Sequence, residues 1–455
     1  MEQRSIVCQR IPGDYSVDKA ELRNAKLLYL LMSALFIADW VMPQYFGFHL
    51  GFDFTATRIF NVIILAYFVL NRKAGNHFFK SMLDVQVTPY LMLYMFVMVY
   101  TTVLRVNVNT FFLNFLDILT FYMVYYGIRY VIGVKKAIDW TVIIAWFLGI
   151  YGLVEYVLGF SPMIRFLLTL PYNNVRSMYR SGSYRIMGPC GHSIGYGLML
   201  ELLIVLICID YDKDEMYLFR HPFLYCVLLL NVFLTGSRLA LGFAIIESAF
   251  IVLFSKRKKI KETLFIFAVF LVGFIVFEIA VFQTSLGQYI MMQITSLIDE
   301  ALGTEFAAKF GADTTWLEDS TSYRRYLPKI FGVEWLSPLV GRGANASFVF
   351  AIEDMYLKSI DNFYVALYIR YAYPGLVTYV LFFLVTIIRM IKEAVQRHSG
   401  VSAALAIGMS TYCISLYWVD YLQTTKYMYI LVAIFFAFCD EKHKNEKRRS
   451  IFSRV

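Results

Sequence analysis

Long apolar runs occupy most of this chain and limit its possible folds more than any other feature. Of its 455 residues, 59% are hydrophobic and 16% are charged, whereas soluble domains have about 45–50% apolar and about 25% charged residues. Runs close to the about 20 residues of a transmembrane helix occur at 27–46, 53–70, 88–104, 110–131, 138–160, 192–210, 222–235, 239–255, 263–283, 362–388, 402–418 and 424–439. The sequence therefore predicts an all-α, polytopic integral membrane protein with about 12 transmembrane helices.

These runs divide the chain into five parts. We predict a cytoplasmic segment at 1–26, transmembrane helices at 27–283, a long extracytoplasmic loop at 284–361, further helices at 362–439 and a basic cytoplasmic tail at 440–455. The short runs 222–235 and 239–255 form either a tight hairpin or one broken helix. Within the loop, the stretches 287–302 and 348–360 are predicted to be amphipathic helices that either lie on the membrane surface or cover a cavity.

Lysine and arginine in the short loops indicate the orientation, because cytoplasmic loops are enriched in them. With the N-terminus inside, the predicted cytoplasmic segments hold 27 of the 42 Lys and Arg residues. These clusters set the topology and contact anionic membrane lipids. The net charge of +9 is thus explained without nucleic acid as a partner.

The remaining 15 basic residues are mostly arginines: 11 are Arg and four are Lys. Arginine is planar and permanently charged, and it binds phosphate through two hydrogen bonds. We therefore predict an anionic, phosphorylated ligand at the outer face. The alternative for the loop arginines is pairing with acids of the same loop, such as Asp299 and Glu318. Arg238 is the strongest candidate, since it lies between two apolar runs with no nearby acid.

Two motifs place arginines beside the starts of helices. The segment 183–193, SYRIMGPCGHS, contains Arg185 and ends near His192 at the start of an apolar run. Free amides at a helix start favour an anion. His192 could move a proton, or it could simply cap the helix. The second motif, TGSRL at 235–239, places Arg238 in the same kind of position.

The long loop carries the third group of candidates. Arg324 and Arg325 are adjacent, Arg342 lies between Gly341 and Gly343, and Asp361 precedes Asn362 at the next apolar run. Among the acids within apolar runs, Asp117, Glu155 and Glu201 could join the same cavity. The six cysteines form no CxxC or Cys/His cluster, so neither a metal nor another cofactor is predicted.

In this order the motifs resemble the O-antigen polymerase and ligase superfamily, which includes the Wzy-type polysaccharide polymerases. The family has Arg-x-x-Gly before a His-led helix start, a Ser-Arg between helices, a large outer loop with an arginine, and a later Pro-Leu-x-Gly-x-Gly. The matching residues here are Arg185 to Gly188 with His192, Ser237-Arg238, Arg324/Arg325, and Pro338 to Gly343. The motifs span roughly 175–380. There are two departures: Asp361 replaces the family's closing His, and Ser193-Ile194 replaces its Pro-Asn.

The resemblance implies a GT-C-like, metal-independent glycosyltransferase of the bacterial inner membrane, with both termini cytoplasmic. It would polymerise oligosaccharide repeat units carried on polyprenyl pyrophosphate into a capsular, exopolysaccharide or O-antigen chain. Pyrophosphate binding would fall to Arg185, Arg238, Arg324, Arg325 and Arg342. Asp361 is the first candidate for the general base and His192 the second. The family also implies inversion at the anomeric carbon and a co-polymerase partner that regulates chain length.

Two alternatives remain open from the sequence. The motifs do not separate a polymerase from a ligase that transfers finished glycan to a lipid core. A flippase or proton-coupled transporter of the same lipid-linked glycan would also suit 12 helices and buried acids. Against a transporter, no internal repeat at half length is visible, although transporters commonly carry one.

Overall fold

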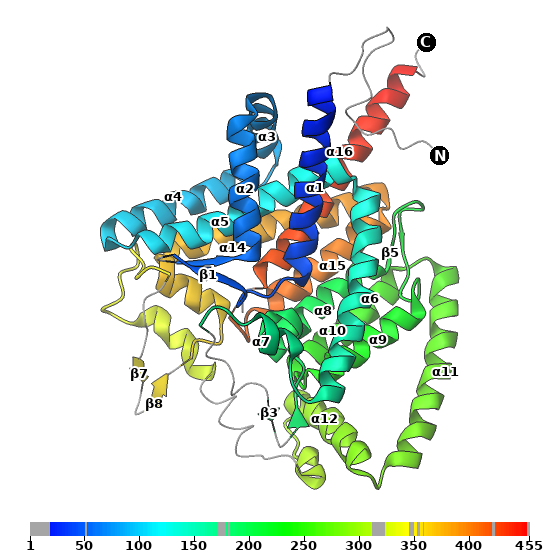
Figure 1. Ribbon diagram of the computed structural model, residues 1–455. Helices are drawn as coiled ribbons and strands as arrows, with labels where there is room; N and C mark the ends of the chain where they lie inside the picture. Colours follow the sequence, from blue (N-terminus) through cyan, green and yellow to red (C-terminus); the bar gives the residue numbers. More distant parts are fainter. Residues whose placement is uncertain are drawn as a thin grey trace.

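The computed structural model is a bundle of helices with short antiparallel ribbons at its ends (Figure 1). The structure describes residues 19–50, 52–171, 179–180, 183–311, 324–344, 350–352, 355–357, 359–420 and 424–452. Four ribbons lie in these ranges: β1 (Gly47–His49) with β2 (Asp53–Thr55), β3 (Tyr179–Arg180) with β4 (Ser183–Tyr184), β5 (Ile209–Asp210) with β6 (Glu215–Met216), and β7 (Phe350–Ile352) with β8 (Met355–Leu357).

Helices follow the apolar runs. In the first half of the chain they are α1 (Lys19–Val41), α2 (Ala56–Leu70), α3 (Arg72–Asp84), α4 (Thr88–Arg105), α5 (Val108–Tyr126), α6 (Val134–Leu158), α7 (Pro162–Leu167) and α8 (Ser193–Ile207). The second half contributes α9 (Pro222–Leu234), α10 (Arg238–Phe254), α11 (Arg257–Val281), α12 (Ser285–Leu302), α14 (Phe363–Arg397), α15 (Gly400–Ser415) and α16 (Thr425–Phe452). Shorter helical turns span Gly127–Ile132, Gly188–Cys190, Phe306–Phe310 and Leu327–Gly332.

Each predicted apolar run coincides with a helix, which confirms a mostly helical chain with several helices able to span a membrane. Five helices in the described residues are long and apolar enough to cross, or six if α3 and α4, bent by 100°, form one broken span. The apolar helices α2, α8, α9 and α15 have 13 to 16 residues. At 1.5 Å per residue they are shorter than a hydrocarbon core of about 30 Å. Twelve spans therefore stay a prediction.

The helix α8 forms the centre of the bundle. Every side chain from Gly195 to Ile207 is buried, because the helix is apolar on all sides. It packs against α6, α9, α10, α15 and α16. The runs on either side of Gly236 are two separate helices, α9 and α10, which contact each other, and Gly236 turns the chain between them with a φ of +59°. The residues before α8 are thus held at the end of a fully packed helix.

Loops predicted to be cytoplasmic meet at one end of the bundle. Asp214, in the β5–β6 connection, accepts from Ser399 and Lys442, which belong to two other predicted cytoplasmic segments. Arg129 pairs with Asp440 at 2.8 Å. The start of α1 and the end of α16 lie at this same end (Figure 1). The loops therefore share one end of the molecule, although the membrane side that it faces stays a prediction.

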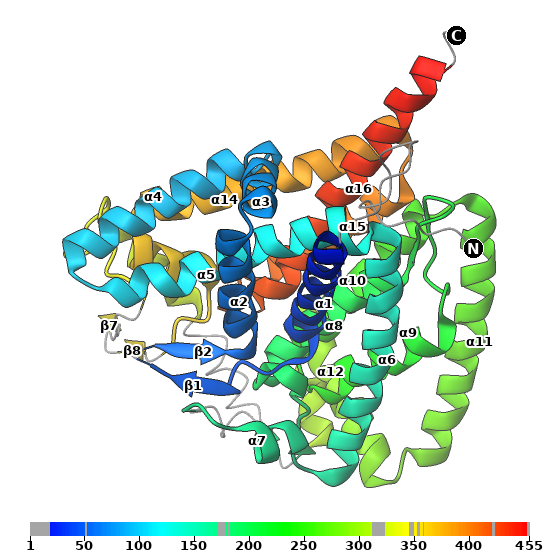
Figure 2. The ribbon, with the colours of Figure 1, turned by 45° about the horizontal axis from the view of Figure 1, so that its top comes forward.

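The helix α11 stands at the edge of the bundle in both views (Figures 1 and 2). Its apolar side chains are largely exposed, including Leu264, Phe265, Val272 and Ile279. An apolar helix with exposed side chains is typical of a segment that faces lipid.

One of the two predicted loop helices is confirmed and the other is wrong. The stretch 287–302 lies within α12. The stretch 348–360 contains the strands β7 and β8 instead, and its residues 348–349, 353–354 and 358 lie outside the described ones. Phe350, Ile352 and Tyr356 belong to residue types that favour a strand.

Candidate functional site

The segment before Arg185 is fixed by a carboxylate at the end of α6. Glu155 accepts hydrogen bonds from the Tyr184 hydroxyl at 2.8 Å, the Met187 amide at 2.9 Å and the Gly188 amide at 3.0 Å. Glu155 is fully buried, and three donors compensate its loss of water. Glu155 was predicted to join the cavity. In the structure it holds the segment that carries Arg185.

Arg185 joins the first two sequence motifs. Its side chain is 7% exposed, and Nε donates to the Thr235 carbonyl at 2.7 Å. The guanidinium also lies on Gly236, where an added Cβ would come within 3.2 Å of Nε. A side chain at 236 would therefore push against the arginine. Residues 185 and 235–238 are neighbours although 50 residues separate them in sequence.

Arg238 is the first residue of α10. Ser237 caps this helix, since its hydroxyl accepts from the Ala240 amide at 3.3 Å. The charge of Arg238 acts on Asp299 of α12. Burial opposes ionisation of Asp299, but a hydrogen bond from Thr304, two backbone amides and the Arg238 charge lower the pKa of that carboxyl. The amphipathic helix α12 is thus positioned beside the start of α10.

His192 caps α8, and its Nδ1 accepts from the Ile194 amide at 3.1 Å. The neutral ring then carries its proton on Nε2. The charges of Arg185 and Asp361 both act on His192. With Nδ1 already in use, the neutral ring offers Nε2–H as a donor. This geometry favours a hydrogen-bond donor over a general base.

Asp361 lies beside the start of α14, which Asn362 caps by accepting from the Val365 amide at 3.0 Å. One carboxylate oxygen of Asp361 accepts from the Ser359 hydroxyl at 2.6 Å, and the other lies 3.5 Å from a guanidinium nitrogen of Arg324. The side chain is 34% exposed. Its charge also acts on His192. Asp361 is therefore held at the site and remains accessible.

The structure thus brings together four predicted site residues, Arg185, His192, Arg324 and Asp361, with Arg238 next to Arg185 through the Gly236 turn. We call these five residues the arginine site. Arg325 is exposed, and Arg342 lies over the Trp335 ring, 5.3 Å from its centroid. No contact of the described residues joins Arg325 or Arg342 to this group.

The motif around Arg342 repairs a break in α14. Ala372 has φ 54° and Pro374 has no N–H, so the carbonyls of Ile369 and Arg370 lose their helical donors. The amides of Arg342 and Gly343 bond these two carbonyls at 2.8 and 3.0 Å, and the amide of Tyr373 bonds the Pro338 carbonyl at 3.1 Å. The Pro-Leu-x-Gly-x-Gly segment therefore has a structural role.

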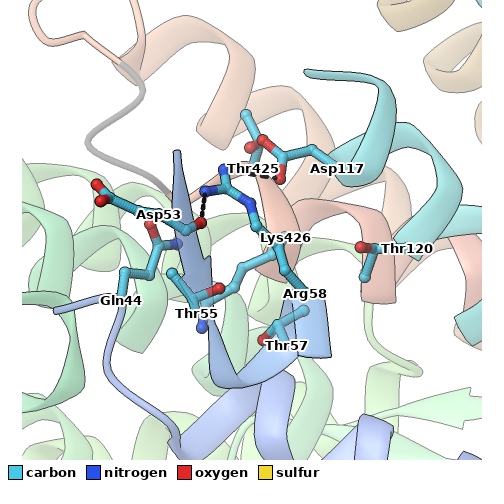
Figure 3. A pocket seen from close by; sticks show the side chains of 9 residues that line it. All are labelled: Gln44, Asp53, Thr55, Thr57, Arg58, Asp117, Thr120, Thr425 and Lys426. Carbon is cyan, nitrogen blue, oxygen red and sulfur yellow. Dashed lines mark hydrogen bonds and ion pairs between the residues drawn. The ribbon is translucent and has the colours of Figure 1, made fainter. Parts of the chain in front are cut away.

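The structure also has a polar pocket, which the sequence did not single out (Figure 3). Its volume is about 70 Å³, and its lining comes from the α1–α2 connection, α2, α5 and α16: Gln44, Asp53, Thr55, Thr57, Arg58, Asp117, Thr120, Thr425 and Lys426. Asp117 was predicted to join a cavity, and it lines this one. Arg58 and Lys426 appeared in the sequence only as basic residues of the outer face, because no local motif marks them.

Ion pairs and hydrogen bonds hold the cations of the polar pocket. Arg58 lies 3.6 Å from Asp117 and donates to the Asp53 carbonyl at 2.8 Å. Lys426 donates to the Met42 carbonyl at 3.1 Å and is 8% exposed. The residue after it, Tyr427, lies 3.5 Å from the sulfur of Cys190, two residues before His192. One wall of the pocket thus adjoins the turn that leads to α8.

The third predicted intramembrane acid does not reach the cavity. Glu201 lies deeper in α8, and its charge interacts with Glu247 of α10, which accepts from Thr411 of α15. Both glutamates are buried in the bundle.

No family model matches this chain, and no curated protein is significantly similar to it. The resemblance to the polymerase and ligase superfamily therefore depends on the motifs and the topology.

Proposed function

We propose that this protein polymerises polyprenyl-pyrophosphate-linked oligosaccharide repeat units by glycosyl transfer at the outer face of a bacterial inner membrane. The observation that carries the proposal is the meeting of Arg185, His192, Arg324 and Asp361, which come from three distant segments. Hydrogen-bond donors and an accessible carboxylate in one site suit a reaction that expels an anion and removes a proton.

The arginines would bind the pyrophosphate of the donor. As the bond between the anomeric carbon and the pyrophosphate oxygen breaks, its electron pair leaves with that oxygen. Arg185 is oriented before the reaction by its bond to Thr235, and preorganised donors stabilise developing charge without reorganising. Arg238 and Arg324 would add charge from α10 and from the loop, and the Nε2–H of His192 would add a neutral donor.

Asp361 would act as the base. The acceptor hydroxyl forms the new bond to the anomeric carbon and gives its proton to the carboxylate. In the structure this carboxylate is 3.5 Å from Arg324. A pyrophosphate that drew Arg324 to itself would leave Asp361 available to the acceptor. The same arginine thus links donor binding to the readiness of the base.

The test uses the purified protein in nanodiscs with a polyprenyl-pyrophosphate repeat unit, and the products are resolved on a gel. We expect a ladder of chain lengths. Arg324→Ala and Asp361→Asn should each lower the rate about 10²- to 10³-fold, the typical cost of losing a transition-state donor or a base. Arg185→Lys keeps the charge but loses the planar fork, and should also slow the reaction.

Arg165→Ala is the matched control, because Arg165 is also an arginine outside the predicted cytoplasmic loops, but it lies against the Phe160 ring, 5.0 Å from its centroid. Arg325→Ala should cost less than Arg324→Ala, since Arg325 is exposed. A ladder that survives Asp361→Asn would exclude this base. Transfer of one finished glycan to a lipid core would indicate a ligase, and passage of uncleaved substrate across a vesicle membrane would indicate a transporter.

A further inference from the structure

The charges of the polar pocket balance. Arg58 faces Asp117 at 3.6 Å, and Lys426 donates to the Met42 carbonyl at 3.1 Å. The carboxylate of Asp53 turns to His49, 2.8 Å away, while its carbonyl faces Arg58. The lining therefore holds two basic side chains, Arg58 and Lys426, and two acidic ones, Asp53 and Asp117. A phosphate would have to displace these carboxylates from their partners, so the pocket suits an uncharged ligand.

Hydroxyl groups supply much of the remaining lining. Thr55, Thr57 and Thr425 each present a group that both donates and accepts, and Gln44 adds an amide. The Thr120 hydroxyl is engaged in both directions, because it accepts from Asn61 at 2.5 Å and donates to the Leu116 carbonyl at 2.8 Å. The hydroxyls of a sugar have the same double character. They could donate to Asp117 and accept from Arg58 or Lys426.

Aromatic rings occur in the same β1–β2 ribbon as Asp53 and Thr55, which line the polar pocket. Asp53 of β2 lies between Phe52 and Phe54 in sequence. The Phe54 ring stacks on Phe48 with centroids 5.4 Å apart, and Phe52 lies parallel to Phe112 at 5.9 Å. Phe48 is 46% exposed and Phe112 is 42% exposed. Aromatic surfaces combined with a few placed polar groups are typical of small-molecule sites, and here they can cover the apolar face of a sugar ring.

We propose that the polar pocket binds a ring of an uncharged sugar, with its hydroxyls on Asp117, Arg58, Lys426 and the threonines and its apolar face toward the phenylalanines of β1, β2 and α5. The volume of about 70 Å³ is several times the about 10–15 Å³ that one water needs. That this sugar belongs to the lipid-linked saccharide rests on the proposed function. Sugar binding itself rests on the pocket alone.

The test is ligand-observed saturation-transfer NMR on the full chain in nanodiscs. The probes are glucose, galactose, rhamnose and N-acetylglucosamine, each added as the free sugar. Inorganic pyrophosphate is followed separately by ³¹P line broadening. At least one sugar should receive saturation. Thr425→Val and Asp117→Asn should weaken its apparent affinity about three- to tenfold, as expected for one lost hydrogen bond, and should leave the pyrophosphate signal unchanged.

Thr378→Val is the matched control, because the Thr378 hydroxyl bonds the carbonyls of its own helix, Pro374 at 2.8 Å and Gly375 at 3.1 Å. Sugar binding should survive this change. The proposal is overturned if none of the four sugars receives saturation, or if the transfer is the same in both pocket variants. It is also overturned if the pocket variants abolish pyrophosphate broadening, which would make the pocket an anion site.

The two proposals fail in different ways. A ladder of polymers together with no pocket-dependent sugar binding would leave the polymerase standing and remove the sugar pocket. Sugar binding lost on Thr425→Val, together with no ladder, would leave a carbohydrate site and remove the polymerase. If both hold, Thr425→Val should raise KM for the repeat unit more than it lowers kcat.

Discussion

Arg185 shows how a single residue is oriented before any ligand arrives. Its Nε donates to the Thr235 carbonyl, and its side chain rests on the bare backbone of Gly236. The hydrogen bond to the carbonyl fixes the plane of the guanidinium, and the glycine leaves room for the side chain beside the backbone. The orientation of Arg185 therefore follows from the fold of residues 235–236.

At the residue scale the sequence predicted the arginine site better than the polar pocket. His192 and Arg238 stand at helix starts beside Gly or Ser, Asp361 precedes the cap of α14, and Arg185 lies three residues before Gly188. Arg58 and Lys426 have no such local signal, since what joins them is the packing of α2 and α16 against α5. Arg342 was a misleading candidate, because the amides of Arg342 and Gly343 bond the carbonyls at the break in α14.

At the scale of elements, the break in α14 and the segment that repairs it form one unit. Two carbonyls and one amide that lose their helical partners find new ones on Pro338, Arg342 and Gly343. Unpaired backbone groups in an apolar environment cost several kcal/mol each. The loop segment is therefore as necessary to α14 as a turn of the helix itself.

Gly341→Ala should weaken this unit. A Cβ at Gly341 would lie 2.1 Å from the Arg370 carbonyl oxygen, so one of the two backbones must move. We expect a loss of about 1–3 kcal/mol, the usual cost of overpacking, seen as a lower Tm. Gly332→Ala is the control, because an added Cβ there has no atom within 4 Å. Equal Tm values for the two variants would show that the segment does not support α14.

The elements themselves were largely predictable, and their lengths were not. Runs of apolar residues predicted the helices, because a helix that is buried and a helix that faces lipid both need apolar side chains. Whether a helix of 15 residues such as α8 reaches across a membrane depends on what covers its ends, which periodicity does not reveal. The strands β7 and β8 were missed because a short run of aromatic and β-branched residues fits either period.

At the scale of the whole molecule, the two ends of the bundle differ in character. One end joins its loops through Asp214, Asp440 and their basic partners, and the other carries the arginine site and the polar pocket. Positive charge in the first set of loops predicts that they face the cytoplasm.

Labelling of intact cells would test this orientation. Glu334→Cys and Lys213→Cys place thiols at exposed positions of the two predicted sides. A membrane-impermeant maleimide should label the first in spheroplasts and the second only after permeabilisation, with the parent chain as the baseline for native thiols. The opposite pattern would invert the topology, and with it the proposed outer location of the arginine site.

The burial of α8 on every face has a consequence for how such a protein can change over time. Because α8 has no exposed side, substitutions at any of its positions disturb packing. We therefore expect the sequence at its start, next to His192, to change slowly during evolution. The β1–β2 ribbon at the rim of the polar pocket is a surface loop, so substitutions there are better tolerated. A change in the ribbon could therefore alter the polar pocket while the residues before α8 stay the same.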